Sequence, residues 1–163
     1  MNRNDRLPFS IREAELGDEG AIVALLRALA VYEKLEAEFH LSEARAIRDM
    51  LGPSRICTCH LLLAEREMAG VAVSFPVYRS FSGRHGIFIE DLFVLPHFRG
   101  RGAGRTLLTH MARIAHAQNG FLEWRALDWN KPAHAFYEGL GAVAIPEWTS
   151  YRLDGEALKR FGT

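Results

Sequence analysis

Two kinds of chemically capable residues lie close together near the middle of the chain. Glu90 and Asp91 interrupt an apolar run at residues 87–95. Because an unpaired charge is costly to bury, carboxylates in such a run usually have a partner or a task. A turn with the sequence Arg-Gly-Arg-Gly-Ala-Gly follows at residues 99–104. Glycine lets backbone N–H groups approach an anion closely, and the arginines add positive charge. The pattern predicts carboxylate chemistry beside an anion-binding turn.

A strand and a helix must position these residues. The run 87–95 has the length and β-branched content of a buried strand. After the turn, apolar residues recur at helical spacing: Leu107, Leu108, Met111, Ile114 and Ala115. A glycine-rich turn between a strand and a helix points free N–H groups and the positive end of the helix dipole at a phosphate. By strand alternation Glu90 and Asp91 face opposite sides of the sheet unless a bulge intervenes.

The rest of the chain predicts a mixed sheet with helices on its faces, which is an α/β (or α+β) fold. We expect helices at 18–34, with Asp18 as N-cap, from Ser42 to the stop at Gly52, up to Asn119 after the glycine turn, and after Asn130. The strand after the long helix should be parallel to the strand before it. The expected strands are 9–14, 57–65 and 68–78 as a hairpin, 87–95, 121–127, 142–145 and 148–153.

Three interpretations of the glycine turn compete. A P-loop needs a Gly-Lys dipeptide, which the sequence does not contain. In a dinucleotide-binding fingerprint Gly100 and Gly102 fit the first two glycine positions, but Arg105 stands at the third, where a large side chain spoils helix–strand packing. The third pattern, R-x-x-G-x-G, fits residues 99–104 without a mismatch. This pattern resembles the pyrophosphate-binding motif of the GNAT superfamily of N-acetyltransferases.

The resemblance extends along nearly the whole chain and is closest to the diamine (spermidine/spermine) acetyltransferase branch. The segments that carry it are 30–36, 90–94, 127–130, 136–137, 140–142 and 147–153. It implies the GNAT acyl-CoA N-acyltransferase fold, with a mixed, mostly antiparallel central sheet flanked by helices. It also implies a single acetyltransferase domain over residues 1–163 and a homodimer whose interface is formed by the C-terminal strands.

The resemblance implies an enzyme that uses acetyl-CoA as cosubstrate, without a metal. The acetyl group would pass by direct attack to a primary amine of a small diamine or polyamine. Two alternatives stay open. The acceptor could be the side-chain amine of an amino acid such as thialysine, or the protein could be a CoA-binding sensor without turnover.

The same resemblance assigns roles to residues. Glu90 would take the substrate proton, directly or through water, and a bulge beside it would open the sheet to the pantetheine arm. Tyr137 would protonate the departing thiolate, although its helical spacing also fits a core residue. Glu90 and Asp91 could instead be salt-bridged, and Asn130 also fits a helix cap. The implied cofactor-binding residues are Leu92, Phe93, Val94, Arg99, Gly100, Arg101, Gly102, Ala103, Gly104, Arg105, Asn130 and Tyr137. The implied substrate-binding residues are Tyr32, Glu33, Glu36, Glu90 and Asp91.

Composition excludes several other classes. Lys plus Arg equals Asp plus Glu, at 20 each, which disfavours a nucleic-acid binder or a membrane-attracted surface. No apolar stretch approaches the roughly 18 residues of a membrane span. Cys57 and Cys59 should share one side of a strand, and no second cysteine pair could complete a zinc site. Without an export signal at the polar N-terminus, we expect a reducing cytoplasm.

Overall fold

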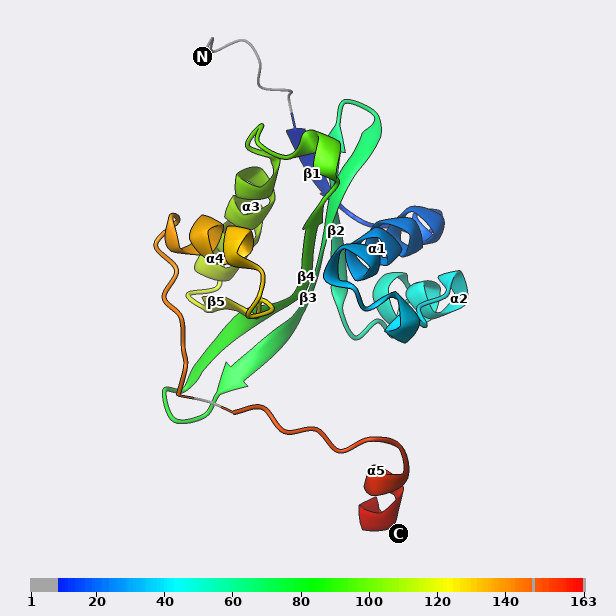
Figure 1. Cartoon of the computed structure of the whole chain (residues 1–163), viewed down its shortest axis with the longest axis vertical. Helices are drawn as coiled ribbons and strands as arrows, with labels where there is room; N and C mark the ends of the chain where they lie inside the picture. Colours follow the sequence, from blue (N-terminus) through cyan, green and yellow to red (C-terminus); the bar gives the residue numbers. More distant parts are fainter. Residues whose placement is uncertain (1–8, 148, 163) are drawn as a thin grey trace. The chain divides into compact units, whose positions relative to one another are not determined.

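The computed structural model describes residues 9–147 and 149–162. The chain forms two compact units, with the boundary between Arg125 and Ala126 (Figure 1). The first unit contains the sheet and the helices that cover it. In the second unit the described helices are α4 (Lys131–Glu138) and α5 (Gly155–Gly162). None of the described helices has the length and the hydropathy that a membrane crossing requires.

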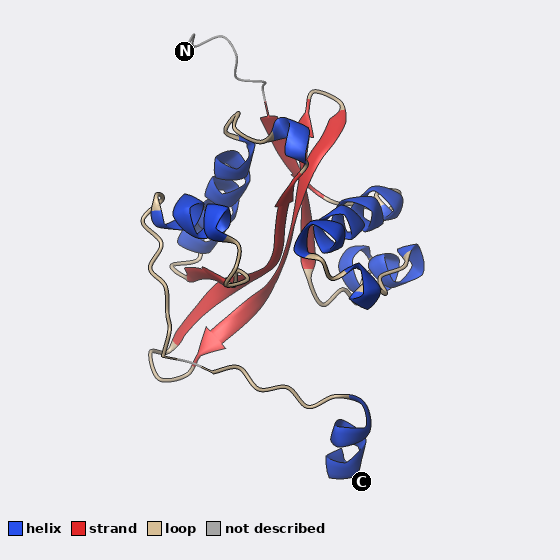
Figure 2. Ribbon diagram, viewed as in Figure 1, coloured by secondary structure: helices blue, strands red, loops and turns tan. Residues whose placement is uncertain are grey.

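The described part of the first unit is built on a five-stranded sheet with the order β1-β2-β3-β4-β5 (Figure 2). The strands are β1 (Phe9–Glu13), β2 (Thr58–Ala64), β3 (Glu67–Arg79), β4 (Arg84–Val94) and β5 (Phe121–Trp124). The first four pair antiparallel, and β5 is parallel to β4. The mixed sheet, the hairpin and the parallel crossover predicted from the sequence are therefore confirmed.

Helices cover both faces of this sheet (Figure 1). On one face lie α1 (Glu19–Glu33) and α2 (Glu43–Ala46), and a π-helical turn at Ile47–Leu51 continues α2. On the other face lies α3 (Ala103–Ala117). The apolar stripe of α1 packs on alternate residues of β2, β3 and β4, and this core includes Ile22, Leu25, Leu26, Leu29, Cys59, Leu61, Val71, Val73 and Phe93. The strands β3 and β4 are thus held between two helical layers.

Local chemistry explains the limits of α2. The Ser42 hydroxyl accepts a hydrogen bond from the Arg45 backbone N–H at 3.3 Å, as an N-cap does. At the other end, the Gly52 N–H donates to the Ile47 carbonyl at 2.6 Å and Pro53 stops the helix. The predicted start and stop of this helix are therefore confirmed.

Two details of the expected fold are wrong. Asp18 occupies the N-cap position of α1 but makes no side-chain cap, because its carboxylate accepts bonds from the Arg12 guanidinium at 2.6 and 2.8 Å and from the Glu15 N–H at 2.9 Å. Strands do not form at 142–145 or over the described residues 149–153, and Trp148 lies outside the described residues. A strand needs a hydrogen-bonded neighbour, and the described structure pairs none with these residues, so local composition alone misled the prediction.

Candidate active site

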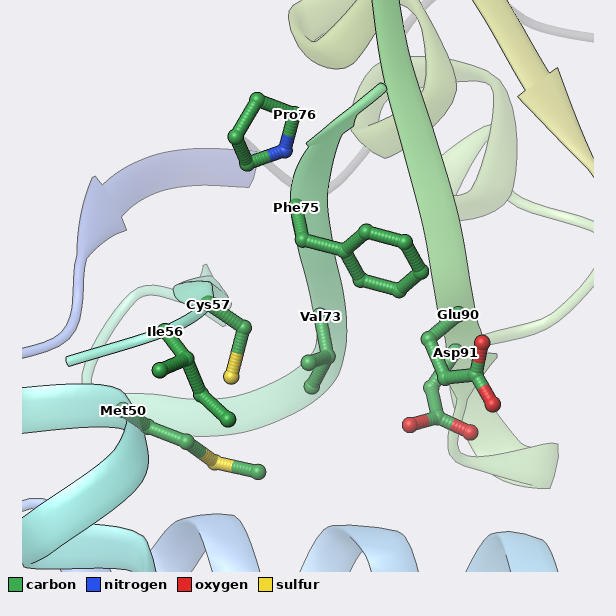
Figure 3. Close-up of a pocket in the computed structure, with 8 residues that line it drawn as sticks. All are labelled: Met50, Ile56, Cys57, Val73, Phe75, Pro76, Glu90 and Asp91. Atoms are coloured by element: carbon green, nitrogen blue, oxygen red, sulfur yellow. The ribbon is translucent and has the colours of Figure 1, made fainter. Parts of the chain in front are cut away.

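A β-bulge brings the two carboxylates together. Val73 pairs with Asp91 and Ser74 pairs with Ile89, so Glu90 is an extra residue in β4. Without it, neighbouring residues would face opposite sides of the sheet. With it, Glu90 and Asp91 both face α1 and α2 and line one pocket (Figure 3). The bulge expected at this point is confirmed.

The rest of the pocket is largely apolar. Its volume is about 470 Å³. Figure 3 shows the two carboxylate groups beside each other, with apolar side chains across the opening. No cationic side chain of the described structure lines the pocket, whose other lining residues are Met50, Ile56, Cys57, Val73, Phe75 and Pro76. The arrangement suits a ligand that has an ammonium group attached to an apolar chain.

Burial brings the pKa of Asp91 close to neutrality. Loss of solvent, followed by the negative charges of Glu90 and Glu33, raises the pKa of Asp91 to about 7. Burial also raises the pKa of Glu33 above its ordinary value. A carboxylate with a pKa near neutrality can accept and return a proton at working pH, which is the requirement for a general base.

The other predicted substrate residues, Tyr32, Glu33 and Glu36, do not line this pocket in the described structure. Glu33 ends α1 and acts on Asp91 through its charge. Tyr32 packs against the Phe93 ring, with centroids 6.4 Å apart. Glu36 is exposed and begins a short 3-10 turn at Glu36–Glu38. Glu33 therefore has an electrostatic link to the pocket.

One edge of β4 opens immediately after the bulge. Pairing with β5 ends at Ile89. Leu95 N–H donates to the Ala69 carbonyl at 2.9 Å, and Phe93 pairs with Val71. In an antiparallel ladder the backbone groups of alternate residues point to alternate sides. The N–H and C=O groups of Leu92 and Val94 therefore point to the open edge. Phe93 instead directs its backbone to β3 and buries its ring.

The glycine turn has the backbone geometry of an anion site. Gly100 and Gly102 have φ angles of 74° and 90°, in the left-handed region that favours glycine. Space is open where a Cβ atom would stand at either position. Among the described residues, no acceptor takes the N–H groups of residues 100–105, and α3 begins at Ala103. These free donors and the start of α3 suit a phosphate group, as the sequence predicted.

The arginines of the turn differ in their placement. Arg101 and Arg105 are exposed. The Arg99 side chain instead folds back onto β4, and its Nε donates to the Val94 carbonyl at 2.8 Å. Ala103 is the first residue of α3 and is buried, and Gly104 follows it in the first turn of that helix. These two residues therefore serve helix packing as well as the turn.

Two further predicted residues, Asn130 and Tyr137, belong to the second unit, whereas the lining residues of the pocket belong to the first. The Asn130 side-chain oxygen accepts the Ala133 N–H at 3.4 Å, so its predicted role as cap of α4 is confirmed. Tyr137 is half-buried on α4, with its ring 5.3 Å from that of Phe136.

Two residues of the pocket wall carry no signal in the sequence. Met50 lies in a helix stripe and Ile56 in a loop, and neither pattern indicates the cavity that they line. On the other face of the sheet, the His110 ring lies 4.9 Å from that of buried His60. Among the described residues, no group of three or more His, Cys, Asp or Glu side chains could hold a metal.

Comparison with known proteins places these features in context. Residues 21–142 match the family described as "Acetyltransferase (GNAT) family". The chain is 36% identical over 162 residues to a thialysine N-epsilon-acetyltransferase of Sus scrofa, covering 91% of this chain and 94% of that protein. It is 28% identical to a human spermidine/spermine N(1)-acetyltransferase-like protein 1, covering 92% of this chain and 23% of that protein. A solved integron cassette protein from the mobile metagenome of V. cholerae shares the fold, with a TM-score of 0.78 and 23% identity over 94% of this chain and 97% of that one.

Proposed function

Because the chain belongs to the GNAT family of acetyltransferases, we propose that it transfers the acetyl group of acetyl-CoA to the side-chain amine of a small amino acid such as thialysine. The observation that carries the proposal is the bulge in β4. It directs the side chains of both Glu90 and Asp91 to one largely apolar pocket, beside the open edge of the strand. The anion-binding turn before α3 supports a phosphate-bearing donor such as acetyl-CoA.

The named relatives favour one of the two acceptors considered from the sequence. The resemblance favoured a diamine or polyamine, with thialysine as the alternative. Relatives named thialysine N-epsilon-acetyltransferase are 33–36% identical over 91% of this chain. The spermidine/spermine-type relative is 28% identical, and the match spans 23% of its length. The comparisons therefore favour the amino-acid acceptor.

A diamine remains the second candidate because of one feature of the pocket. An amino acid carries an α-carboxylate, and no cationic side chain of the described structure lines the pocket to pair with it. A diamine would instead offer a second ammonium group to a site with two carboxylates. Relatives and pocket chemistry thus point to different acceptors, which makes the choice a sharp experimental question.

The residues would divide the chemistry as follows. An alkyl ammonium has a pKa near 10, so about one molecule in a thousand is free amine at neutral pH. We assign the base to Asp91 in place of Glu90, because the pKa of Asp91 is raised to about 7. Asp91, with Glu90 beside it, would accept the ammonium proton before the free amine attacks the thioester carbon. Leu92 or Val94 would donate a backbone N–H to the oxyanion that forms. Tyr137 would give its hydroxyl proton to the departing thiolate.

A thiol-release assay with thialysine, lysine, putrescine and spermidine tests the proposal. We expect thialysine to give the highest kcat/KM. A preference for putrescine or spermidine would move the function to the second candidate. No turnover with any of the four, together with tight CoA binding, would favour the sensor alternative.

Donor binding is tested by thermal unfolding. Acetyl-CoA at about 100 times its Kd should add about 2.7 kcal/mol to the free energy of unfolding. Gly102→Ala should weaken this effect, because it places a side chain at a φ of 90° inside the turn. Gly83→Ala is the matched control, since Gly83 has a φ of 62° and equally open surroundings but lies in the β3–β4 loop. Equal loss of CoA binding in both variants would contradict the proposed donor site.

Two broader expectations remain predictions. We infer from the resemblance that residues 1–163 act as one catalytic domain and that the protein is a homodimer. Sedimentation velocity measures the oligomeric state, and limited proteolysis at the junction of residues 125 and 126 tests the single domain. Rapid cleavage at that junction would contradict it.

A further inference from the structure

The Arg99 side chain is held by one carbonyl and two aromatic rings. Its Nε donates to the Val94 carbonyl at 2.8 Å. Its guanidinium carbon lies 4.6 Å from the centroid of the Tyr32 ring and 5.4 Å from that of Phe93. A guanidinium can stack on rings and donate a directed bond at the same time, and an ammonium group cannot reproduce this combination. The side chain therefore joins α1 to β4.

The carbonyl that Arg99 occupies lies on the open edge of β4. The register with β3 turns both the N–H and the C=O of Val94 toward that edge, beyond the end of the β5 pairing. On that side of β4, no strand of the described structure pairs with the residues after Ile89, so their outward N–H and C=O groups have no ladder partner. By holding the Val94 carbonyl, Arg99 fixes the orientation of the peptide groups that carry the neighbouring N–H donors.

Arg99 also lies between the end of β4 and the glycines of the anion-binding turn. Its own N–H donates to the Pro96 carbonyl at 3.1 Å, and Gly100 reverses the chain immediately after it. Phe93, on which the guanidinium stacks, is 3% exposed and packs in the same core as α1. The turn and the open edge are thus tied to one buried point.

We propose that Arg99 is a positioning residue for the thioester end of the donor, not a ligand of its phosphates. It holds the edge of β4 so that the N–H groups of Leu92 and Val94 meet the thioester in a fixed geometry. Arg101 and Arg105 then supply the charge for the phosphates. This inference rests on the proposed acetyl transfer.

Two acetyl donors separate the roles. S-acetylpantetheine carries the same thioester and arm as acetyl-CoA but lacks every phosphate of the nucleotide and the pyrophosphate. Arg99→Lys keeps the charge and loses the stacked, directed contact. We expect kcat to fall on the order of 10- to 100-fold with both donors, because a displaced reacting group costs about that much. The ratio of kcat/KM for the two donors should stay at the wild-type value.

Arg101→Gln and Arg105→Gln are the matched comparisons. Each should raise KM for acetyl-CoA and leave the reaction with S-acetylpantetheine unchanged, because that donor has no phosphate to lose. The inference is overturned if Arg99→Lys behaves like these two variants, or if it keeps wild-type kcat with both donors.

A second pair of variants keeps the test available if Arg99→Lys does not fold. Tyr32→Leu removes the ring under the guanidinium and should lower kcat with both donors. Tyr32→Phe keeps the ring and should lower kcat less, and both variants should retain the wild-type ratio of kcat/KM for the two donors. Circular dichroism establishes folding.

If wild-type protein turns over no amine, the proposed function fails, and Arg99 is then tested by the affinities of Arg99→Lys for CoA and pantetheine. Equal losses of affinity for both molecules support positioning, and a loss of affinity for CoA alone overturns it. Binding of neither molecule to the wild type would overturn both.

Discussion

Both faces of the sheet bury titratable groups, and those on the α1/α2 face line a pocket. On the α1/α2 face, Asp91 lies beside Glu90 in the pocket wall. On the α3 face, His60 from β2 meets His110 from α3, with ring centroids 4.9 Å apart. The His60 Nδ1 and the His110 Nε2 are buried and have no hydrogen-bond partner within the described structure.

Burial acts on both faces in the same physical direction, toward the neutral form. It raises the pKa of Asp91 to about 7 and lowers the pKa values of both histidines below 6.5. The charges of His110 and Arg55 lower the pKa of His60 further, whereas Glu13 on β1 opposes that shift. The charge of Arg113 lowers the pKa of His110 further. On the pocket face an ammonium ligand can compensate the Asp91 charge. The difference is that Asp91 lines a pocket, where a ligand could use its shifted pKa, whereas the two histidines contact each other.

The largest expected effect is on the pocket face. Asp91→Asn should lower kcat/KM on the order of 10²- to 10⁴-fold, because it removes the proton acceptor. Wild-type activity should rise with pH through about 7, the pKa of Asp91, and the variant should lose this rise. Steady-state kinetics across pH measure both effects. Glu65→Gln, at an exposed carboxylate in the β2–β3 turn, serves as the control. An unchanged pH profile in Asp91→Asn would remove Asp91 as the base.

Asp91→Asn also has a predictable effect on stability. The folded pKa of Asp91 lies above its ordinary value of 3.8, so ionising Asp91 in the folded state is unfavourable. Its contribution to stability is complete below about pH 3.8 and is lost as the pH rises through about 7. Above that pH the variant should therefore be more stable than the wild type in urea unfolding. Lower stability of Asp91→Asn at alkaline pH would show that the carboxylate has a stabilising partner instead.

The next effect tests whether the α3 face is structural. Leu107 is fully buried on α3. Leu107→Ala should lower the free energy of unfolding by about 2–5 kcal/mol, because it leaves a cavity between α3 and the sheet. Thr109→Ala, at an exposed position of the same helix, should change it by less than about 0.5 kcal/mol. Urea unfolding measures both. A small loss in Leu107→Ala would mean that this face is loosely packed.

The smallest effect concerns the histidine pair. Because the folded pKa values of His60 and His110 are lowered, their neutral forms contribute stability that is present above about pH 6.5 and lost as the pH falls. Urea unfolding should therefore show a falling free energy of unfolding as the pH drops from about 7.5 to about 5.5. His110→Leu should remove part of this dependence, whereas exposed His116→Leu should leave it unchanged. Identical pH profiles for His110→Leu and wild type would contradict the burial argument.

Particular residues show where sequence reasoning succeeded. The apolar stripe of α3 and the glycines before it are local patterns, and the helix and the turn formed where they were expected. Ser42 and Asn130 cap their helices as predicted, because a cap involves residues three apart. The C-terminal strands failed for the opposite reason. Residues 142–145 have the apolar composition of a short buried strand, but a strand depends on a partner that the local sequence does not contain.

The sequence by itself determined the central strand, the glycine turn and α3, since helical spacing and left-handed glycines depend on neighbours along the chain. It also determined the family, through motifs spread over most of the chain. Only the tertiary structure decided that Glu90 and Asp91 share one face, that Arg99 turns back to Val94, and that His110 meets His60. The shared face depends on the register of β4 against β3, and the histidine pair depends on the packing of α3 on the sheet. Arg99 reaches Val94 over five residues, but its stacking on Tyr32 joins residues far apart in the chain.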